Sequence, residues 1–214
     1  TVIDDEDLNL WNTSSVTNME SAFELTTFSS NVDISSWDVS NVINMKRMFA
    51  RSDFNQLIDS WDVSSVIDMS AMFSQATVFN RPLDAWNTSS VIDMNNMFNR
   101  AISFNQSINS WDVSNVADMS EMFFSARNFN QPLNSWDTSN VTNMSEMFAF
   151  ALEFNSSVFT LVSSVTNMSG IFKGATVFNQ PLDSWDTSSV TNMSEMFSQT
   201  RFFDQDLNSW NTSS

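Results

Sequence analysis

Carboxylates are the side chains of this chain best suited to chemistry, because Asp and Glu number 25 and the sequence contains no His, Cys or Tyr. Many of them recur directly after a tryptophan, at spacings of 24 to 26 residues. Carboxylates stacked in this way could bind a hard cation such as calcium, which takes oxygen ligands. The candidate binding residues are this recurring set and the serines two positions further on: Asp38, Asp62, Asn87, Asp112, Asp137, Asp186, Ser64, Ser114 and Ser139.

Two interpretations of this acidic set stay open. Adjacent carboxylates repel by about 1 kcal/mol even in water, and bound calcium would relieve that repulsion. The positions in question are Asp38, Asp62, Asp112 and Asp137. Alternatively, each side chain accepts hydrogen bonds from nearby backbone N–H groups, as in Asx turns. Asn87 and Leu161 interrupt the row of charges, and a metal-binding column would not tolerate that loss. The sequence therefore favours Asx turns. It predicts no firm metal site and no cofactor, with calcium as the one alternative left open.

An enzyme is not expected. Without His or Cys, imidazole and thiol nucleophiles are excluded, and two glycines, Gly170 and Gly174, cannot build a phosphate-binding loop. The carboxylates recur at equivalent positions and do not converge on one cleft. The formal net charge of −17 argues against nucleic acid as a partner, and no apolar run is long enough to predict membrane insertion.

These residues belong to a repeat of about 25 residues, a length in the range of leucine-rich repeats. Its tryptophan position falls at residues 11, 37, 61, 86, 111, 136, 160 and 185, with threonine at 160. No linker or composition shift interrupts the pattern, so residues 1–214 are predicted to form a single repeat domain of about eight 24–26-residue units. The chain begins and ends in nearly the same repeat phase, which fits an excerpt of a longer array or copies stacked end to end.

Each unit is expected to contain a short strand and a short helix. Trp136 and Thr138 alternate with Asp137, which predicts a strand with its acidic residue facing outward. Segment 144–151 then places apolar residues at i, i+3, i+4 and i+7, the stripe of one helix face. Several arginines fall at the end of this predicted helix, where a cation suits the helix dipole: Arg51, Arg100, Arg127 and Arg201.

Other recurring residues are interpreted as structural. The methionines of the helical stripe are typical of a core. In the unit that lacks tryptophan, Phe159 is expected to fill the vacant volume. An asparagine ladder follows the turn phenylalanine of each unit and is expected to satisfy loop backbone groups. Its members are Asn55, Asn80, Asn105, Asn130, Asn155 and Asn179.

The repeat also resembles a known family. Residues 133–148 read Leu-Asn-Ser-Trp-Asp-Thr-Ser-Asn-Val-Thr-Asn-Met-Ser-Glu-Met-Phe after Phe-Asn-Gln-Pro, and this motif is similar to the BspA-like leucine-rich-repeat family of surface proteins over residues 8–214. The resemblance implies an α/β repeat solenoid, a right-handed leucine-rich-repeat-like superhelix with short parallel β-strands on the concave face and short helices on the convex face. It also implies an extracellular or cell-surface protein that functions in adhesion. The family motif consists of structural positions and transfers no binding residue.

Three functions are therefore considered. The first is a non-enzymatic surface or extracellular repeat protein that mediates adhesion or binds a protein or glycan on another cell or surface. The second is a structural module that associates with itself end to end in a filament, fibre or surface layer. The third, ice or crystal-surface binding, needs a flat outward threonine array. Thr142, Thr166 and Thr191 could contribute to such an array, but other units have isoleucine or alanine there.

Overall fold

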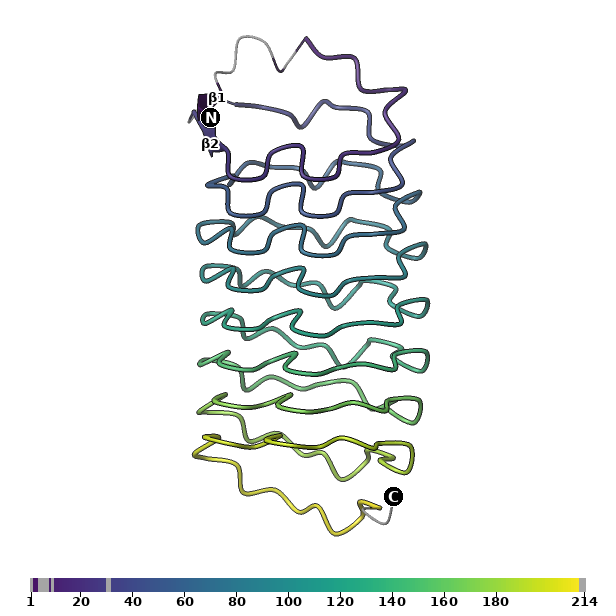
Figure 1. Ribbon diagram of the computed structural model, residues 1–214, viewed down its shortest axis with the longest axis vertical. Helices are drawn as coiled ribbons and strands as arrows, with labels where there is room; N and C mark the ends of the chain where they lie inside the picture. Colours follow the sequence, from purple (N-terminus) through teal and green to yellow (C-terminus); the bar gives the residue numbers. More distant parts are fainter. Residues whose placement is uncertain (1, 4–7, 9, 30–31, 212–214) are drawn as a thin grey trace.

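The computed structural model describes residues 2–3, 8, 10–29 and 32–211 and has the form of a tall stack of flattened circuits of chain (Figure 1). Each circuit is one repeat and is called a rung below. The chain runs along the stack, so the first and last described rungs lie at opposite ends (Figure 1).

Regular secondary structure is sparse in these rungs. β1 (Val2–Ile3) and β2 (Thr27–Phe28) form a parallel pair, and residues 10–29 and 32–211 contain no helix. The expected α/β repeat solenoid, with parallel strands on a concave face and helices on a convex face, is therefore wrong. In the described part of the chain, no helix is long and apolar enough to cross a membrane.

Segment 144–151, predicted as a helix, is a run of tight turns that hydrogen-bonds to the next rung. The N–H groups of Met144, Glu146 and Phe148 donate to carbonyls of that rung at 2.8 to 2.9 Å. Between them, N–H groups such as that of Met147 donate to the carbonyl three residues back. In a helix all of these groups would donate four residues back. Half of the backbone donors here join the rungs instead.

Two residues of this segment have a left-handed backbone conformation, four positions apart. Glu146 has a φ of 54° and Phe150 a φ of 58°, as the third position of a type II turn requires. In the next rung the same two places are taken by Gly170 and Gly174, the chain's two glycines. The apolar spacing that predicts a helix serves these turns equally, because it buries the same residues. Met144, Met147, Phe148 and Ala151 are fully buried.

The predicted strand around Trp136 is irregular backbone between the turns at 134–135 and 139–140, but its inside–outside pattern is confirmed. Trp136 is buried and Asp137 is exposed. Side chains join the rungs here, since Nε1 of Trp136 donates to the carbonyl of Ile108 at 3.0 Å. Nδ2 of Asn140 likewise donates to the carbonyl of Ser114 at 2.7 Å.

The interior is built from stacked aromatic rings. Phe98 stacks on Phe73 of the preceding rung and Phe123 of the following rung, with ring centroids 5.6 and 5.7 Å apart. Phe159 is fully buried and stacks on Trp185 at 5.9 Å, so its predicted role as a tryptophan substitute is confirmed. Buried hydrophobic residues of all the described rungs form one cluster, which makes the stack a single packed body.

Gly174 gives a direct test of this stacking. A Cβ at Gly174 would lie 2.5 Å from Cδ1 of Phe150 in the preceding rung, so the ring would have to move. We expect Gly174→Ala to destabilise the protein by about 1–3 kcal/mol, the usual cost of overpacking. Urea unfolding monitored by tryptophan fluorescence measures the change.

Two further variants separate the clash from backbone strain. Ser125 occupies the place of Phe150 in the preceding rung, so Phe150→Ser should remove most of the penalty of Gly174→Ala. Gly170→Ala, whose new Cβ would meet the flexible Glu146 side chain at 3.1 Å, should cost less. If Gly174→Ala lowers the free energy of unfolding equally in the wild type and in the Phe150→Ser background, the clash is excluded as the cause.

Candidate functional site

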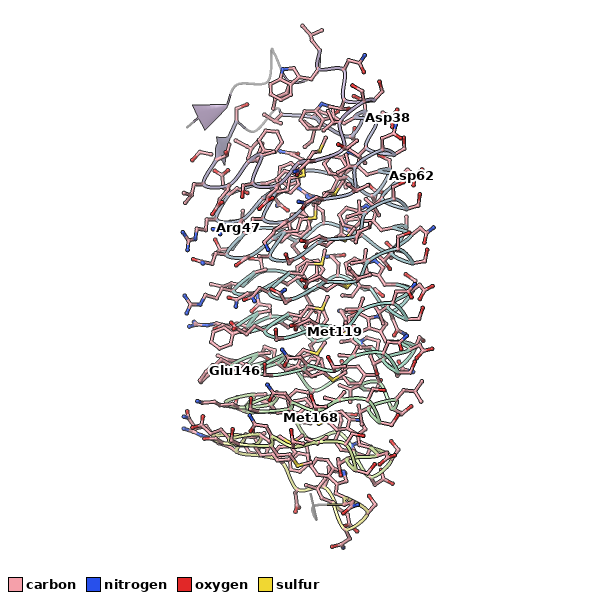
Figure 2. All side chains as sticks on the ribbon, turned by 45° about the vertical axis from the view of Figure 1, so that its right-hand side comes forward. Asp38, Arg47, Asp62, Met119, Glu146 and Met168 are labelled. Atoms are coloured by element: carbon pink, nitrogen blue, oxygen red, sulfur yellow. The ribbon has the colours of Figure 1, made fainter. Side chains whose placement is uncertain are left out.

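The acidic residues that follow tryptophan lie along one edge of the stack and are called the acidic column. Figure 2 shows Asp38 and Asp62 at this edge, while Arg47 and Glu146 lie at the opposite edge and Met119 lies between them. The column consists of Asp38, Asp62, Asn87, Asp112, Asp137 and Asp186, all of them exposed.

Each member of the acidic column folds back on its own turn. Oδ1 of Asp62 accepts hydrogen bonds from the N–H of Ser64 at 3.1 Å and from its hydroxyl at 2.6 Å. The same pair of bonds joins Asp112 to Ser114. Backbone donors reach Asp38, Asn87, Asp137 and Asp186 from the serine two residues on. This is the Asx-turn arrangement that the sequence favours, and it leaves Ser64, Ser114 and Ser139 only half exposed.

These hydrogen bonds also stabilise the ionised form of the column. The hydroxyl and N–H of Ser64 lower the pKa of Asp62, and they outweigh burial and the charge of Asp38, which both raise it. The influence of Asp38 means that neighbouring carboxylates lie close enough to interact, as expected from the repeat. The pKa values of Asp38, Asp112, Asp137 and Asp186 are lowered by their serines in the same way. The column is therefore ionised at neutral pH.

The calcium hypothesis finds no assembled ligand set in this geometry. Among the described residues, no group of three or more Asp, Glu, His or Cys side chains is arranged to hold a metal ion. A calcium ion needs six to eight oxygen ligands, whereas each position here offers a single carboxylate whose Oδ1 is already bonded by its own turn. The four positions concerned are Asp38, Asp62, Asp112 and Asp137.

A second line of carboxylates, which the sequence reasoning did not single out, lies where the rungs form parallel bridges. Asp68, Asp93 and Asp118 are bridged in succession. Burial raises the pKa of Asp93, and the charges of Asp68 and Asp118 add to the rise, although hydrogen bonds from Asn95 oppose it. The sequence signal for this second line is that each of these three aspartates directly precedes a methionine and that they recur at the repeat spacing.

The asparagine ladder has the structural role predicted for it. The N–H of Asn105 donates to Oδ1 of Asn80 at 3.0 Å, and the N–H of Asn130 donates to Oδ1 of Asn105 at 2.9 Å. Asn55, Asn155 and Asn179 continue the same chain of bonds. Each side chain therefore satisfies the backbone of the next rung. Asn130 and Asn155 are exposed, and the other members of the ladder are half-buried.

The column considered for ice binding is exposed but chemically mixed. Thr142, Thr166 and Thr191 are exposed, and in earlier rungs Ile43 and Ile67 take the same place with 48% and 42% exposure. A uniform threonine surface is therefore limited to the later rungs. That function stays a prediction without a specific structural observation in its favour.

Sequence comparison places the chain in a family. A family model described as Mycoplasma protein of unknown function, DUF285, matches residues 1–94, 79–162 and 160–214. The chain belongs to this family, and the three successive matches support a tandem repeat protein. They do not specify the BspA-like family. Searches of curated proteins and of solved structures gave no match.

Asp93 provides a pH-dependent test of the electrostatics. In Asp93→Asn the oxygen that accepts two bonds from Asn95 is kept, while the repulsion from Asp68 and Asp118 is removed. Because the folded pKa of Asp93 is raised, its ionised form costs stability above that pKa. We expect Asp93→Asn to stabilise the protein at pH 7 by about 1 kcal/mol.

The gain should disappear below about pH 4, the unperturbed range of aspartate, because the side chain is then neutral in both folded and unfolded states. Thermal unfolding at pH 7 and pH 3 measures this difference. Asp112→Asn is the matched control, since the pKa of Asp112 is lowered and its charge favours folding at pH 7. A similar gain from both variants would contradict the assignment.

Proposed function

We propose that this member of the DUF285 family is a non-enzymatic protein of the cell surface or extracellular space that mediates adhesion. In this proposal the acidic column binds a protein or glycan on another cell or surface. The observation that carries it is a row of ionised carboxylates, interrupted at Asn87 and Leu161, each held by its own turn on a tightly packed stack.

The geometry supports binding in two ways. The turns fix each carboxylate before a partner arrives, so less side-chain freedom is lost on binding. In the described residues, Oδ2 of Asp62 and Oδ2 of Asp112 make no hydrogen bond, because the serines engage Oδ1. Those oxygens are available to cationic or hydroxyl groups of a partner. The net charge of −17 would also speed encounter with a basic surface.

The BspA-like resemblance adds support for surface display. The motif at residues 133–148 carries the resemblance, and adhesion is the role it implies. Because the leucine-rich-repeat fold is wrong, we transfer only the surface location and the adhesive role to the proposal.

Column variants test the proposal directly. The triple variant Asp62→Asn, Asp112→Asn, Asp137→Asn keeps every Asx turn, because the asparagine Oδ1 accepts the same bonds and Asn87 already does so. We expect it to bind cultured cells about tenfold more weakly than the wild type, because exposed charge contacts contribute about 0.5 kcal/mol each and a total near 1.4 kcal/mol corresponds to a factor of ten. Flow cytometry with the fluorescently labelled chain measures the binding.

The charge-matched control changes acids outside the column. Asp59→Asn, Asp84→Asn, Asp183→Asn removes the same three charges at a repeat position where Asn109 and Asn134 occur naturally. This control should bind like the wild type. Treating the cells with protease or with glycosidases then distinguishes a protein partner from a glycan. Equal loss in both triple variants, or no binding by the wild type, would refute adhesion through the column.

End-to-end assembly of residues 1–214 is a second candidate, favoured by backbone groups of its first and last described rungs. Within the described residues, the N–H groups of Glu195 and Phe197 in the last rung donate no hydrogen bond, and the carbonyls of Glu20 and Ala22 in the first rung accept none. A second copy in register would pair these groups as the internal rungs do. The first rung also has an apolar hollow of about 170 Å³ beside Trp11.

Sedimentation velocity at rising protein concentration tests this assembly. We expect a concentration-dependent series above the 24.3 kDa monomer, because unpaired backbone edges add further strands. Ala22→Lys puts a charge on the exposed end and should abolish the series, whereas Ala117→Lys on the exposed side should not. A monomer at every concentration would rule the assembly out.

A further inference from the structure

A basic hollow lies outside the acidic column. It has a volume of about 500 Å³, and three of its lining residues are Arg51, Arg100 and Arg127. Arg51 also lines an adjoining hollow of about 200 Å³ together with Arg47, which lies at the edge opposite Asp38 (Figure 2). Arginines therefore gather on this side of a chain that has only 8 Lys and Arg residues.

The backbone of the turns fixes where these arginines emerge. Arg51 and Arg100 occupy the same place two rungs apart, and both have a left-handed conformation with φ of 57° and 56°. Their N–H groups donate to carbonyls of the next rung at 2.7 and 2.6 Å. At a rung spacing of about 4.8 Å, the two backbones are about 10 Å apart. Arg127 follows in the neighbouring line of residues, one rung further along.

The hollow has an excess of positive charge that the described residues do not neutralise by ion pairing. The ion pairs found in the described part of the chain are Arg47 with Glu24 and Lys173 with Glu195. Burial alone would raise the pKa of Glu24, but Ser21, Arg47 and the charge of Arg51 lower it. Arg51 is thus partly balanced, whereas neither Arg100 nor Arg127 has an ion-pair partner in the described residues.

Two acids of the neighbouring rungs accept hydrogen bonds from other residues. Oε2 of Glu121 accepts a hydrogen bond from Nδ2 of Asn99 at 2.9 Å, and Oδ1 of Asp53 accepts one from the N–H of Phe28 at 2.8 Å. The guanidinium of Arg100 lies over the ring of Phe124, 5.7 Å from its centroid. This contact holds one face of the group and leaves its N–H donors available.

We propose that the basic hollow binds an oligosaccharide that carries carboxylate or sulfate groups. The planar guanidinium groups of Arg100 and Arg127 match the two oxygens of such an acid. Gln75, Thr77 and Ser125 also line the hollow and can both donate to and accept from sugar hydroxyls. A volume of about 500 Å³ is within the range of small-ligand sites.

The geometry favours a short acidic glycan over other anions. The N–H groups of Arg51, Gln75, Arg100 and Ser125 are all used in bonds between rungs, so an extended peptide cannot add here through its main chain. A long polyanion such as nucleic acid would meet the acidic remainder of the surface and be repelled. A few acidic groups on a sugar chain fit the local charge. The proposal does not rest on the acidic column.

The test uses variants that the repeat already accommodates. Gln75 and Gln199 stand at the place of Arg100, and Thr77 stands at the place of Arg127, so Arg100→Gln with Arg127→Thr keeps the fold. Arg201→Thr is the matched control, because Arg201 has the repeat position of Arg127, is exposed and lies outside the hollow. Unchanged thermal unfolding of both proteins verifies the fold.

Isothermal titration calorimetry with residues 1–214 compares four probes. They are a hyaluronan tetrasaccharide with carboxylates, a heparin-derived tetrasaccharide with sulfates as well, neutral chitotetraose, and an Asp/Glu-rich peptide. We expect at least one acidic tetrasaccharide to bind, with affinity about tenfold lower in the double variant and unchanged in the control. Hyaluronan binding identifies carboxylate as sufficient, and binding of the heparin fragment alone identifies sulfate.

Four outcomes would overturn the proposal. In the first, neither acidic tetrasaccharide binds, and in the second, chitotetraose binds as tightly as the acidic sugars. In the third, Arg201→Thr weakens binding as much as the double variant does. In the fourth, the acidic peptide binds more tightly than the acidic sugars. The first two exclude an acidic-sugar site, the third reduces the effect to net charge, and the last reassigns the hollow to a protein partner.

Discussion

Hydrogen bonds from one rung to the next are the interaction on which the rest of the described structure depends. In segment 144–151 alternate N–H groups donate to the following rung, and the groups between them close tight turns. Neither set forms a complete element within one rung, so a single repeat has little structure that could persist alone. The left-handed residues Glu146 and Phe150 turn the chain so that donors alternate in this way. Register follows, and each residue lies next to its equivalent in the neighbouring rung.

That register places identical or similar side chains of neighbouring rungs in contact. Whether the contact is favourable depends on the residue type. For aromatic rings it is favourable, as the offset stacking of Phe98 between two phenylalanines illustrates. For asparagine it is also favourable, because one amide satisfies the next backbone N–H. For carboxylates the outcome depends on burial. Asp62 is exposed, and the bonds from Ser64 lower its pKa, whereas the burial of Asp93 outweighs the bonds from Asn95 and, with the charges of Asp68 and Asp118, raises its pKa.

From the sequence, the buried positions and the columns of equivalent residues could be predicted better than the helices, strands or turns to which those residues belong. The buried stripe at 144–151, the substitution by Phe159 and the asparagine ladder follow from periodicity alone. A helix and a run of tight turns would bury the same positions of segment 144–151, so the apolar spacing cannot distinguish the two structures. The distinction lies in where the N–H groups donate, which depends on residues about 25 positions away. Gly170 and Gly174, four residues apart, were the local signal for left-handed turns.

The two candidate sites also differ in how far the sequence predicts them. The acidic column was predictable because one residue type recurs at one repeat position. The basic hollow was not, because its arginines belong to two different lines of residues and were assigned to a helix dipole. Without a helix that dipole is absent, and Arg100 has no structural role of that kind. Only the stack brings Arg100 and Arg127 together.

Net charge is consequently a poor guide to where this protein binds. On the acidic edge Asp112 and Asp137 are neighbours, and serine donors inside the protein stabilise their charges. On the basic edge Gln75 separates Arg51 from Arg100, which spaces the positive charges and reduces their repulsion. Among the described residues, however, no carboxylate is paired with Arg100 or Arg127. The column has its Oδ1 atoms bonded within its own turns and offers Oδ2 to cationic or hydroxyl groups, whereas the hollow holds donors that an external anion would complete.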